Sequence, residues 1–547
     1  MSDKVTGGEV VAALLERAGV TAAFGVISIH NMPILDAFGR RNRIRFVPAR
    51  SEGGAVNMAD AFTRVSGGMG VALSSTGTAA GNTCGAMVEA ETAGTPMLHI
   101  TGQIELPYLD KSRGYIHEAR DQLGMLRAVS KAAYRVWSAD TLAGTMREAI
   151  RVARTPPTGP VSVEIPIDIQ EGAMTWPADL EPLPVHAPEP AADALDALAR
   201  ALEGKRRPLL WLGGGARGAA EEVARLVERG FGVVSSVQGR GIVPEDHPQT
   251  LGAFNATPEI EQFYATCDAM LVVGSRLRGN ETLRYTLKLP RPLYQIDADP
   301  TQQGRAYTAD LFVAGDAAKS LAVLAERLAG KIKIDPKFAA DLAAARKAAE
   351  ASLRAGLGPY AELVDALHAA MPRGSVWVRD VTVSNSTWGN RMLRVHGPRD
   401  GVHALGGGIG QGVPMAIGAA LAADERKTVV LAGDGGLHVS LGELATLVQE
   451  KPNVTLIVMN DRGYGVIRNI QDAKFDGRRY FVDLHTPDMG ELARTLGLQF
   501  FRAKSTGEIP SAVKAAVAHR GPALLEIDMN AIGPFAAKFA GPPVRKS

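Results

Sequence analysis

Two short polar clusters near the carboxyl end of the chain have the residue types and spacing of a site for a cation and an anion. The stretch Gly433–Gly436 reads Gly-Asp-Gly-Gly after the apolar run 428–432, and the pair Asn460-Asp461 follows the apolar run 454–459. Glycines let the backbone approach an anion closely and direct N–H groups at it. The carboxylates of Asp434 and Asp461 offer the oxygen ligands that Mg²⁺ prefers. The arrangement therefore predicts a metal ion held over a diphosphate.

A strand, a glycine-rich turn, a helix and a second strand must position these clusters. Ser440 and Glu443 have the spacing of a capping box, which predicts a helix over 441–450 between the two strands. Both clusters then lie at the carboxyl ends of parallel strands, where open α/β sheets bind ligands. A second capping box, Thr6 with Glu9, predicts a helix over 10–18.

The composition is that of an α/β protein with several domains. The chain has 547 residues, of which 46% are hydrophobic and 22% charged, and a net charge of +2. That charge predicts neither a nucleic-acid footprint nor a polybasic membrane patch, so we expect neither partner. Cys84 and Cys267 are too isolated to indicate disulfides or zinc. The first residues lack an apolar signal segment, and no apolar run approaches the roughly 18 residues of a membrane span. We therefore expect a cytoplasmic protein.

Strands and helices alternate along the chain, which predicts an α/β fold of three domains, each with a parallel sheet flanked by helices. The predicted domains cover residues 1–172, 191–335 and 336–547. Between the first two, residues 173–190 are rich in proline, which neither a helix nor a central strand tolerates, and we interpret them as a linker.

The cluster spacing and the domain layout resemble the thiamine-diphosphate (ThDP) dependent decarboxylase and carboligase superfamily. The resemblance implies ThDP and Mg²⁺ as cofactors, and a pyrimidine-binding, a central and a diphosphate-binding domain in that order. It also implies the backbone carbonyl of Gly463 as a third metal ligand. The family usually has two asparagines at the second cluster, so Asp461 adds a negative charge there. The family builds its active sites between subunits, which implies a homodimer or homotetramer.

ThDP enzymes activate the cofactor with a buried glutamate, and Glu52 resembles that residue. It is followed by small residues and by the stretch Ala59–Arg64, which is similar to the family's ADGYAR-like segment. Ile409, the one large side chain in a glycine-rich stretch, resembles the residue that bends the cofactor. The resemblance implies further cofactor contacts from Asn82, Ser384, Asn385, Gly407, Gly433, Asp434, Gly435, Gly436, Asp461, Tyr464 and Gly465.

Proton handling distinguishes the reactions of the family. His30 resembles the active-site histidine of benzaldehyde lyase, and His117 stands where acetolactate synthases have glutamine; a histidine can move protons near neutral pH. Pyruvate decarboxylases have a glutamate just after the metal motif, where this chain has Val466 and Ile467. That difference disfavours aldehyde release and favours carboligation. We predict an acetolactate-synthase-like enzyme that decarboxylates a small 2-oxo acid and adds the product to a carbonyl acceptor.

Three alternatives stay open. The first is an enzyme for aryl substrates, similar to benzaldehyde lyase or benzoylformate decarboxylase, which His30 supports. The second is a dinucleotide-dependent oxidoreductase, because Gly213–Gly218 spells GxGxxG, although no clear acidic residue follows about 20 positions later. The third is a regulatory subunit that has lost catalysis. The stretch Arg276–Asn280 departs from the RFDDR pattern of acetolactate synthases, so FAD is not favoured in the central domain.

Overall fold

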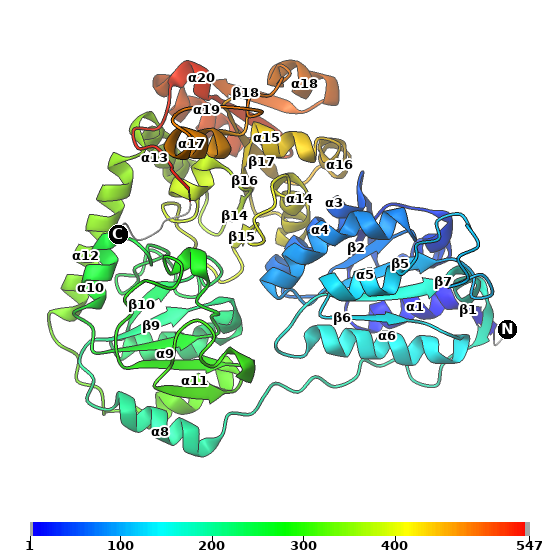
Figure 1. The fold of residues 1–547 in the computed structure, drawn as a ribbon, viewed down its shortest axis with the longest axis horizontal. Coiled ribbons are helices and arrows are strands. Elements are labelled where there is room, and N and C mark those ends of the chain that lie inside the picture. Colours follow the sequence, from blue (N-terminus) through cyan, green and yellow to red (C-terminus); the bar gives the residue numbers. More distant parts are fainter. Residues whose placement is uncertain (1–3, 542–547) are drawn as a thin grey trace.

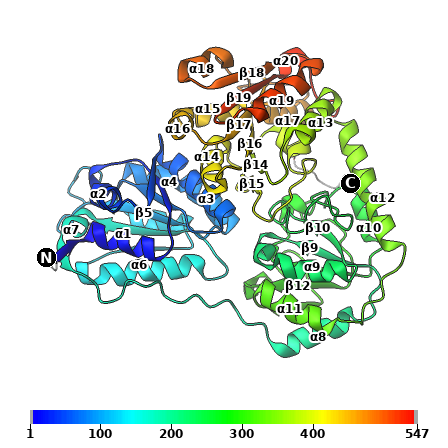
Figure 2. The same cartoon turned by 180° about the vertical axis from the view of Figure 1, so that it is seen from behind.

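The computed structural model describes residues 4–541, which form three lobes joined by long connections (Figures 1 and 2). Each lobe is built around one sheet whose strands are all parallel, with helices packed against it. The predicted fold class is therefore confirmed. Residues 542–547, part of the predicted last domain, lie outside the described residues. In the described part of the chain, no helix is long and apolar enough to cross a membrane.

The first sheet has the strand order β3-β2-β4-β5-β7-β6. Its strands are β2 (Ala22–Gly25), β3 (Arg45–Pro48), β4 (Val71–Ser74), β5 (Leu98–Gln103), β6 (Ala132–Arg135) and β7 (Val161–Pro166). Its helices are α1 (Gly7–Arg17), α2 (Met32–Arg41), α3 (Glu52–Ser66), α4 (Thr78–Ala93), α5 (Gln122–Val129), α6 (Ala139–Arg154) and α7 (Ile167–Glu171). The capping box predicted at Thr6 is confirmed, since the Thr6 side chain accepts from the Glu9 N–H and the Glu9 carboxylate accepts from the Thr6 N–H.

The segment predicted as a linker begins with a short strand. β8 (Ala173–Thr175) pairs antiparallel with β1 (Lys4–Thr6) and so ties the end of the first domain to its beginning. Residues 176–191 then carry neither helix nor strand. The predicted domain boundaries themselves remain predictions.

The central sheet has the order β10-β9-β11-β12-β13. Its strands are β9 (Pro208–Leu212), β10 (Gly232–Ser235), β11 (Ala269–Val273), β12 (Leu293–Asp297) and β13 (Leu311–Ala314). Its helices are α8 (Ala192–Leu202), α9 (Ala220–Glu228), α10 (Pro258–Tyr264) and α11 (Ala317–Arg327). The long helix α12 (Phe338–Ala355) also packs here, because Phe338, Leu342 and Ala349 are buried in the same cluster as Leu209 and Trp211 of β9.

The last sheet repeats the topology of the first. Its order is β15-β14-β16-β17-β19-β18, so in both sheets the strands lie in the order second, first, third, fourth, sixth, fifth along their own domain. The strands are β14 (Val376–Arg379), β15 (Gly401–His403), β16 (Thr428–Gly433), β17 (Val454–Asn460), β18 (Gln499–Ala503) and β19 (Ala523–Asp528). The helices are α13 (Ala361–Ala370), α14 (Gly412–Ala423), α15 (Asp434–Val439), α16 (Glu443–Glu450), α17 (Gly465–Lys474), α18 (Met489–Leu496), α19 (Ile509–Ala518) and α20 (Met529–Ile532).

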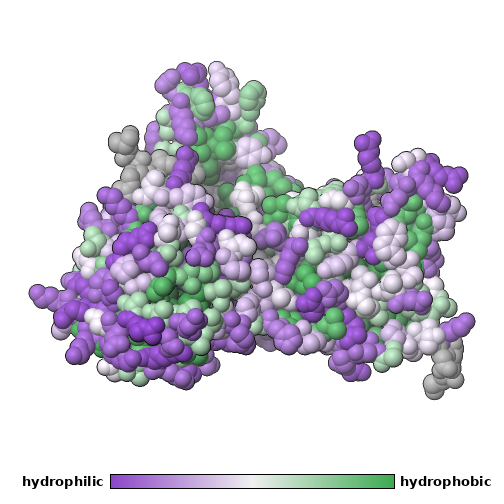
Figure 3. All heavy atoms as spheres, turned by 60° about the horizontal axis from the view of Figure 1, so that its bottom comes forward, coloured by the Kyte–Doolittle hydropathy of each residue, from purple (hydrophilic) through white to green (hydrophobic). Residues whose placement is uncertain are grey.

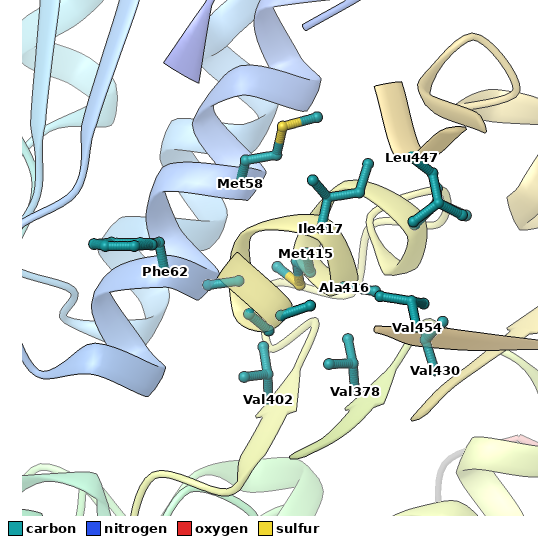
Figure 4. Packing of buried hydrophobic residues seen from close by; sticks show 14 of the residues in the cluster. Met58, Phe62, Val378, Val402, Met415, Ala416, Ile417, Val430, Leu447 and Val454 are labelled. Carbon is teal, nitrogen blue, oxygen red and sulfur yellow. The ribbon is translucent and has the colours of Figure 1, made fainter. Parts of the chain in front are cut away.

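Helices α3 and α14 join the first and last domains into one apolar core. Figure 4 shows Met58 and Phe62 of α3 beside Met415 and Ile417 of α14, above the valines of the last sheet. The helices approach closely at Gly418, where an added Cβ would lie 2.0 Å from the Met58 carbonyl oxygen. Burial of these side chains from two domains fixes the first domain against the last within one chain.

Candidate functional site

Both outer sheets place some of their predicted site residues where the strand order reverses. In the last sheet this point lies between β14 and β16, where β16 ends at Gly433 and Asp434 follows it. In the first sheet it lies between β2 and β4, which lead to His30 and Ser75. Connections leave such a point in opposite directions and open a crevice at the carboxyl ends of the strands, where α/β proteins bind ligands.

The three predicted metal ligands come together at this edge of the last sheet. Asp434 is buried, and its carboxylate accepts hydrogen bonds from the N–H of Asp461 at 3.4 Å and of Gly463 at 3.0 Å. The Thr486 hydroxyl donates to the same carboxylate at 3.1 Å, a contact that the sequence did not indicate. Among residues 4–541, no group of three or more His, Cys, Asp or Glu side chains could hold a metal. A site here therefore needs the Gly463 carbonyl beside its two carboxylates.

The electrostatics of this pair fit a divalent cation. Burial, and after it the neighbouring Asp434 carboxylate, raise the pKa of Asp461 to about 7 against the opposing effect of Arg468. Two carboxylates that repel each other in this way are stabilised by a shared cation, and their hard oxygen atoms suit Mg²⁺. The hydroxyl of Ser384 and the side-chain oxygen of Asn385 are buried, with no hydrogen-bond partner among the described residues. Buried polar atoms of this kind fit the polar groups of an absent ligand.

Replacing Asp461 by asparagine should raise the melting temperature of the metal-free protein at pH 8 by roughly 3 °C or more. The pKa of Asp461 is about 7 in the folded protein and about 4 in an unfolded chain. The unfolded chain therefore loses this proton first, and the folded protein loses stability as the pH rises through that window. Asparagine removes this effect. Thermal unfolding in EDTA from pH 4 to pH 8 measures it, and a difference between the proteins that does not change with pH would contradict the assignment.

Two glycines of the predicted set are required by close packing around the metal ligands. A Cβ at Gly465 would lie 2.0 Å from the Asp461 carboxylate, and a Cβ at Gly435 would lie 2.9 Å from the ring of Tyr464. Both positions therefore need glycine before any ligand is considered. Tyr464 itself is fixed by its N–H, which donates to the Val482 carbonyl at 2.8 Å.

The capping box predicted at Ser440 is wrong. Helix α16 begins at Glu443 rather than at 441, and the Ser440 hydroxyl has no hydrogen-bond partner among the described residues. The Glu443 carboxylate instead accepts from the N–H of Arg50 at 3.2 Å and from the hydroxyl of Ser51 at 2.9 Å. Glu443 thus anchors the last domain to the two residues that precede Glu52.

The glycine-rich loop between β15 and α14 presents the predicted cofactor contacts to the outside. Gly407 has a φ of 84°, and no atom lies within 4 Å of a Cβ built on it. The side chain of Ile409 is 38% exposed, although isoleucine is usually buried. An apolar side chain held out on a glycine loop is available to support a bound ring.

In the first domain, Glu52 and Asn82 lie together. Glu52 is the first residue of α3, which Ser51 caps, and the Asn82 amide donates to the Glu52 carboxylate at 3.1 Å. Glu52 is half-buried in the single chain, whereas we expected it to be buried, because it occupies the first turn of a helix at the domain surface. In the described part of the chain, no hydrogen bond joins Glu52 or Asn82 to the metal half of the site.

The two predicted histidines also meet. The rings of His30 and His117 are 5.4 Å apart in an edge-to-face arrangement, and His30 Nδ1 lies 3.4 Å from the Ser75 hydroxyl. Burial first, and His117 second, hold the pKa of His30 below its ordinary value, while Glu105 partly opposes them. His117 is exposed and has a φ of 66°. One neutral buried histidine therefore contacts a second one that faces solvent.

Close packing explains the glycine motif of the central domain without a bound dinucleotide. A Cβ at Gly213 would lie 2.1 Å from the Gly274 carbonyl oxygen, so these glycines let the loops after β9 and β11 touch. The neighbouring β10 ends at Ser235 and is followed by Ser236, without the acidic residue that a dinucleotide-binding sheet uses. A cavity of about 370 Å³ lies between this loop and the first domain. That FAD is possible but not favoured in the central domain remains a prediction.

Comparison with known proteins gives consistent matches along the chain. Residues 5–125 match the N-terminal TPP binding domain of thiamine pyrophosphate enzymes, residues 195–324 their central domain, and residues 382–527 their C-terminal TPP binding domain.

Curated relatives cover nearly the whole chain. A probable 2-ketoarginine decarboxylase of Pseudomonas aeruginosa is 31% identical over 96% of this chain and 94% of its own. A probable acetolactate synthase large subunit of Methanocaldococcus jannaschii is 28% identical, over 95% of this chain and 91% of its own. Acetolactate synthase isozyme 1 large subunit of Escherichia coli is 25% identical, over 96% and 94%.

Proposed function

The chain belongs to the thiamine pyrophosphate (ThDP) enzymes, as a ThDP-dependent decarboxylase or carboligase, and we propose that it decarboxylates a small 2-oxo acid and transfers the remaining acyl unit to a second carbonyl compound. The observation that carries this proposal is the pairing of His30 with His117 at the site of the first domain, together with apolar Val466 and Ile467 after the metal motif.

The residues of the last domain would bind and bend the cofactor. Asp434, Asp461 and the Gly463 carbonyl would hold Mg²⁺, with Ser384 and Asn385 beside it. Ile409 would support the ring and force the bent form. Bound ThDP would supply a nucleophilic carbon and an electron sink for decarboxylation of the 2-oxo acid.

The residues of the first domain would handle protons. Glu52, oriented by Asn82, would hold a proton at the aminopyrimidine ring. His30 stays neutral because its pKa is lowered, so it can accept a proton inside the site and pass it towards the exposed His117. Positions 466 and 467 carry valine and isoleucine, so neither provides an acid that would protonate the decarboxylated acyl unit early. A second carbonyl compound can therefore react first.

We infer that two copies of the chain complete each site, in a cytoplasmic homo-oligomer. Within one chain the described contacts between the outer domains include α3 with α14, Glu443 with Arg50, and Glu89 with the loop 404–411. No described hydrogen bond joins Glu52 or Asn82 to the Asp434 cluster. Exposed apolar side chains flank both half-sites, namely Ile27, Ile29, Met32 and Ile116 in the first domain and Ile409, Val439 and Ile467 in the last. Figure 3 shows hydrophobic residues gathered in the recess beside the right-hand lobe, which holds the amino terminus. Such surfaces support a partner chain.

One observation favours a second substrate class, a 2-oxo acid with a cationic side chain. The P. aeruginosa relative is named for 2-ketoarginine, which carries a guanidinium group. In this chain the charge of Glu105 opposes the lowering of the His30 pKa. One carboxylate oxygen of Glu105 is buried without a hydrogen-bond partner among the described residues. The Tyr115 hydroxyl donates to the other oxygen at 3.1 Å. A guanidinium group would satisfy the free oxygen.

The experiment is a comparison of kcat/KM for CO₂ release from pyruvate, benzoylformate and 2-ketoarginine, with ThDP and Mg²⁺ present. Preference for pyruvate supports the acetolactate-synthase-like proposal, and preference for benzoylformate supports the aryl alternative. Preference for 2-ketoarginine supports the cationic class, in which case Glu105→Gln should reduce that preference by roughly tenfold. Release of CO₂ from none of them by cofactor-loaded protein would contradict all three.

A further inference from the structure

The loop 404–411, which carries Gly407 and Ile409, is held at both ends by buried carboxylates. Glu89 of α4 binds its beginning, and Asp380, directly after β14, binds its end. The side chain of Glu89 is fully buried, and Asp380 is 1% exposed. Neither residue stood out in the sequence.

Glu89 receives two backbone N–H groups and an arginine. One of its oxygens accepts from the Leu405 N–H at 2.7 Å and from Arg64 at 2.8 Å, and the other accepts from the Gly406 N–H. Arg64 also donates to the His403 carbonyl at 2.8 Å, just ahead of the loop. Hydrogen bonds to an ionised acceptor are short and strong, so this end of the loop is fixed by the first domain of the same chain.

Asp380 fixes the other end from within the last domain. Its carboxylate accepts from the N–H groups of Gly410 and Gly412, each at 3.1 Å, and from Val381 at 2.7 Å. It also touches the metal motif, because a Cβ at Gly436 would lie 2.9 Å from its oxygen. Asp380 therefore ties the glycine loop to the cluster that holds Asp434.

The glycines at the loop ends fit these carboxylates. A Cβ at Gly406 would lie 2.9 Å from the Glu89 carboxylate, and a Cβ at Gly412 would lie 2.8 Å from the Cβ of Asp380. Each acidic side chain thus approaches the backbone more closely than a Cβ at that position would permit. Between the two ends, Gly407 to Ile409 are exposed.

We propose that Glu89 and Asp380 are positioning residues, which hold loop 404–411 so that Gly407 and Ile409 meet the aminopyrimidine ring in one fixed geometry. This rests on the proposed function, which places the cofactor against the loop. Neither carboxylate touches the reacting atoms. Both carboxylates act on the ring only through the position of the loop. Because Glu89 belongs to the first domain, that position depends on how the first domain packs against the last.

The test is Glu89→Gln, in the full-length protein with Mg²⁺. Glutamine keeps the size of the side chain but turns an NH₂ group towards one of the two backbone N–H groups. The dissociation constant of ThDP should rise by roughly tenfold. The near-ultraviolet circular dichroism of the bound aminopyrimidine should also change, because it reports how the ring is held.

The matched control is Thr95→Val. The Thr95 hydroxyl donates to Asp60 at 2.6 Å in the same buried network, and among the described residues it makes no hydrogen bond to the loop. This variant should lose stability while keeping the affinity and the spectrum of bound ThDP. Asp380→Asn, which weakens the other end, should behave as Glu89→Gln does. If Glu89→Gln fails to fold, Glu89→Asp keeps the charge but withdraws the carboxylate, and it should show the same change.

Unchanged ThDP affinity and spectrum in the folded Glu89 and Asp380 variants would overturn the proposal. An equal loss in Thr95→Val would also overturn it, because the role would then be one of general stability. Failure of the wild-type protein to bind ThDP would instead contradict the proposed function.

Discussion

Replacing Glu52 by glutamine should lower turnover of the 2-oxo acid by roughly a hundredfold or more, while ThDP still binds. A glutamine can accept the hydrogen bond from Asn82 as Glu52 does at 3.1 Å, so the local structure should persist. It cannot exchange a proton with the ring. The measurement combines steady-state CO₂ release with calorimetric titration of ThDP.

The control for this experiment is Glu91→Gln. Glu91 lies further along α4, and its carboxylate is also partly buried, since burial raises its pKa. It makes no contact with Glu52 or Asn82 among the described residues. Its removal should leave turnover unchanged within about twofold. Retention of near wild-type turnover by Glu52→Gln would show that Glu52 does not activate the cofactor.

Replacing Asp434 by alanine should weaken ThDP binding in Mg²⁺ by roughly a hundredfold or more. The variant loses one of the two carboxylates of the predicted metal site. Thr486→Val serves as the control, because it removes only the hydrogen bond that Thr486 donates to Asp434. Its effect should be at least tenfold smaller. Tight ThDP binding by Asp434→Ala would contradict the assignment of Asp434 as a ligand of the metal that binds ThDP.

The two inactive variants together test whether a site is shared between chains. A heterodimer of Glu52→Gln and Asp434→Ala chains, isolated with two different affinity tags, should recover about half the activity of the wild type. One of its two sites would then combine an intact first domain from one chain with an intact last domain from the other. A heterodimer as inactive as its parents would show that each chain builds its own site.

Much of the fold, and the grouping of Asp434, Asp461 and Gly463, could be predicted because the information is local in the sequence. The apolar runs that become β16 and β17 lead directly into Asp434 and Asp461, so a strand and its ligand are adjacent along the chain. The same holds for Ser51 and Glu52 at the start of α3. Parallel strands then bring their ends to one edge of a sheet.

The residues that the sequence did not reveal act over long separations. Glu89 binds Leu405, 316 positions away, and Glu443 binds Arg50, 393 positions away. Nothing in the sequence near Glu89 distinguishes it from a solvated helix residue. The error at Ser440 has the same origin, because Glu443 is engaged by the first domain and is not available to cap its own helix. Asp380 is different, since an acid directly after an apolar strand is a signal that a local reading could have used.

Carboligation is tested by the ratio of products formed from the preferred 2-oxo acid. The protein is supplied with ThDP, Mg²⁺ and a second carbonyl compound, and CO₂, aldehyde and 2-hydroxy ketone are quantified together by mass spectrometry. A carboligase should form nearly one 2-hydroxy ketone for each CO₂ released. Free aldehyde in amounts equal to CO₂, whatever acceptor is offered, would contradict carboligation and leave a simple decarboxylase.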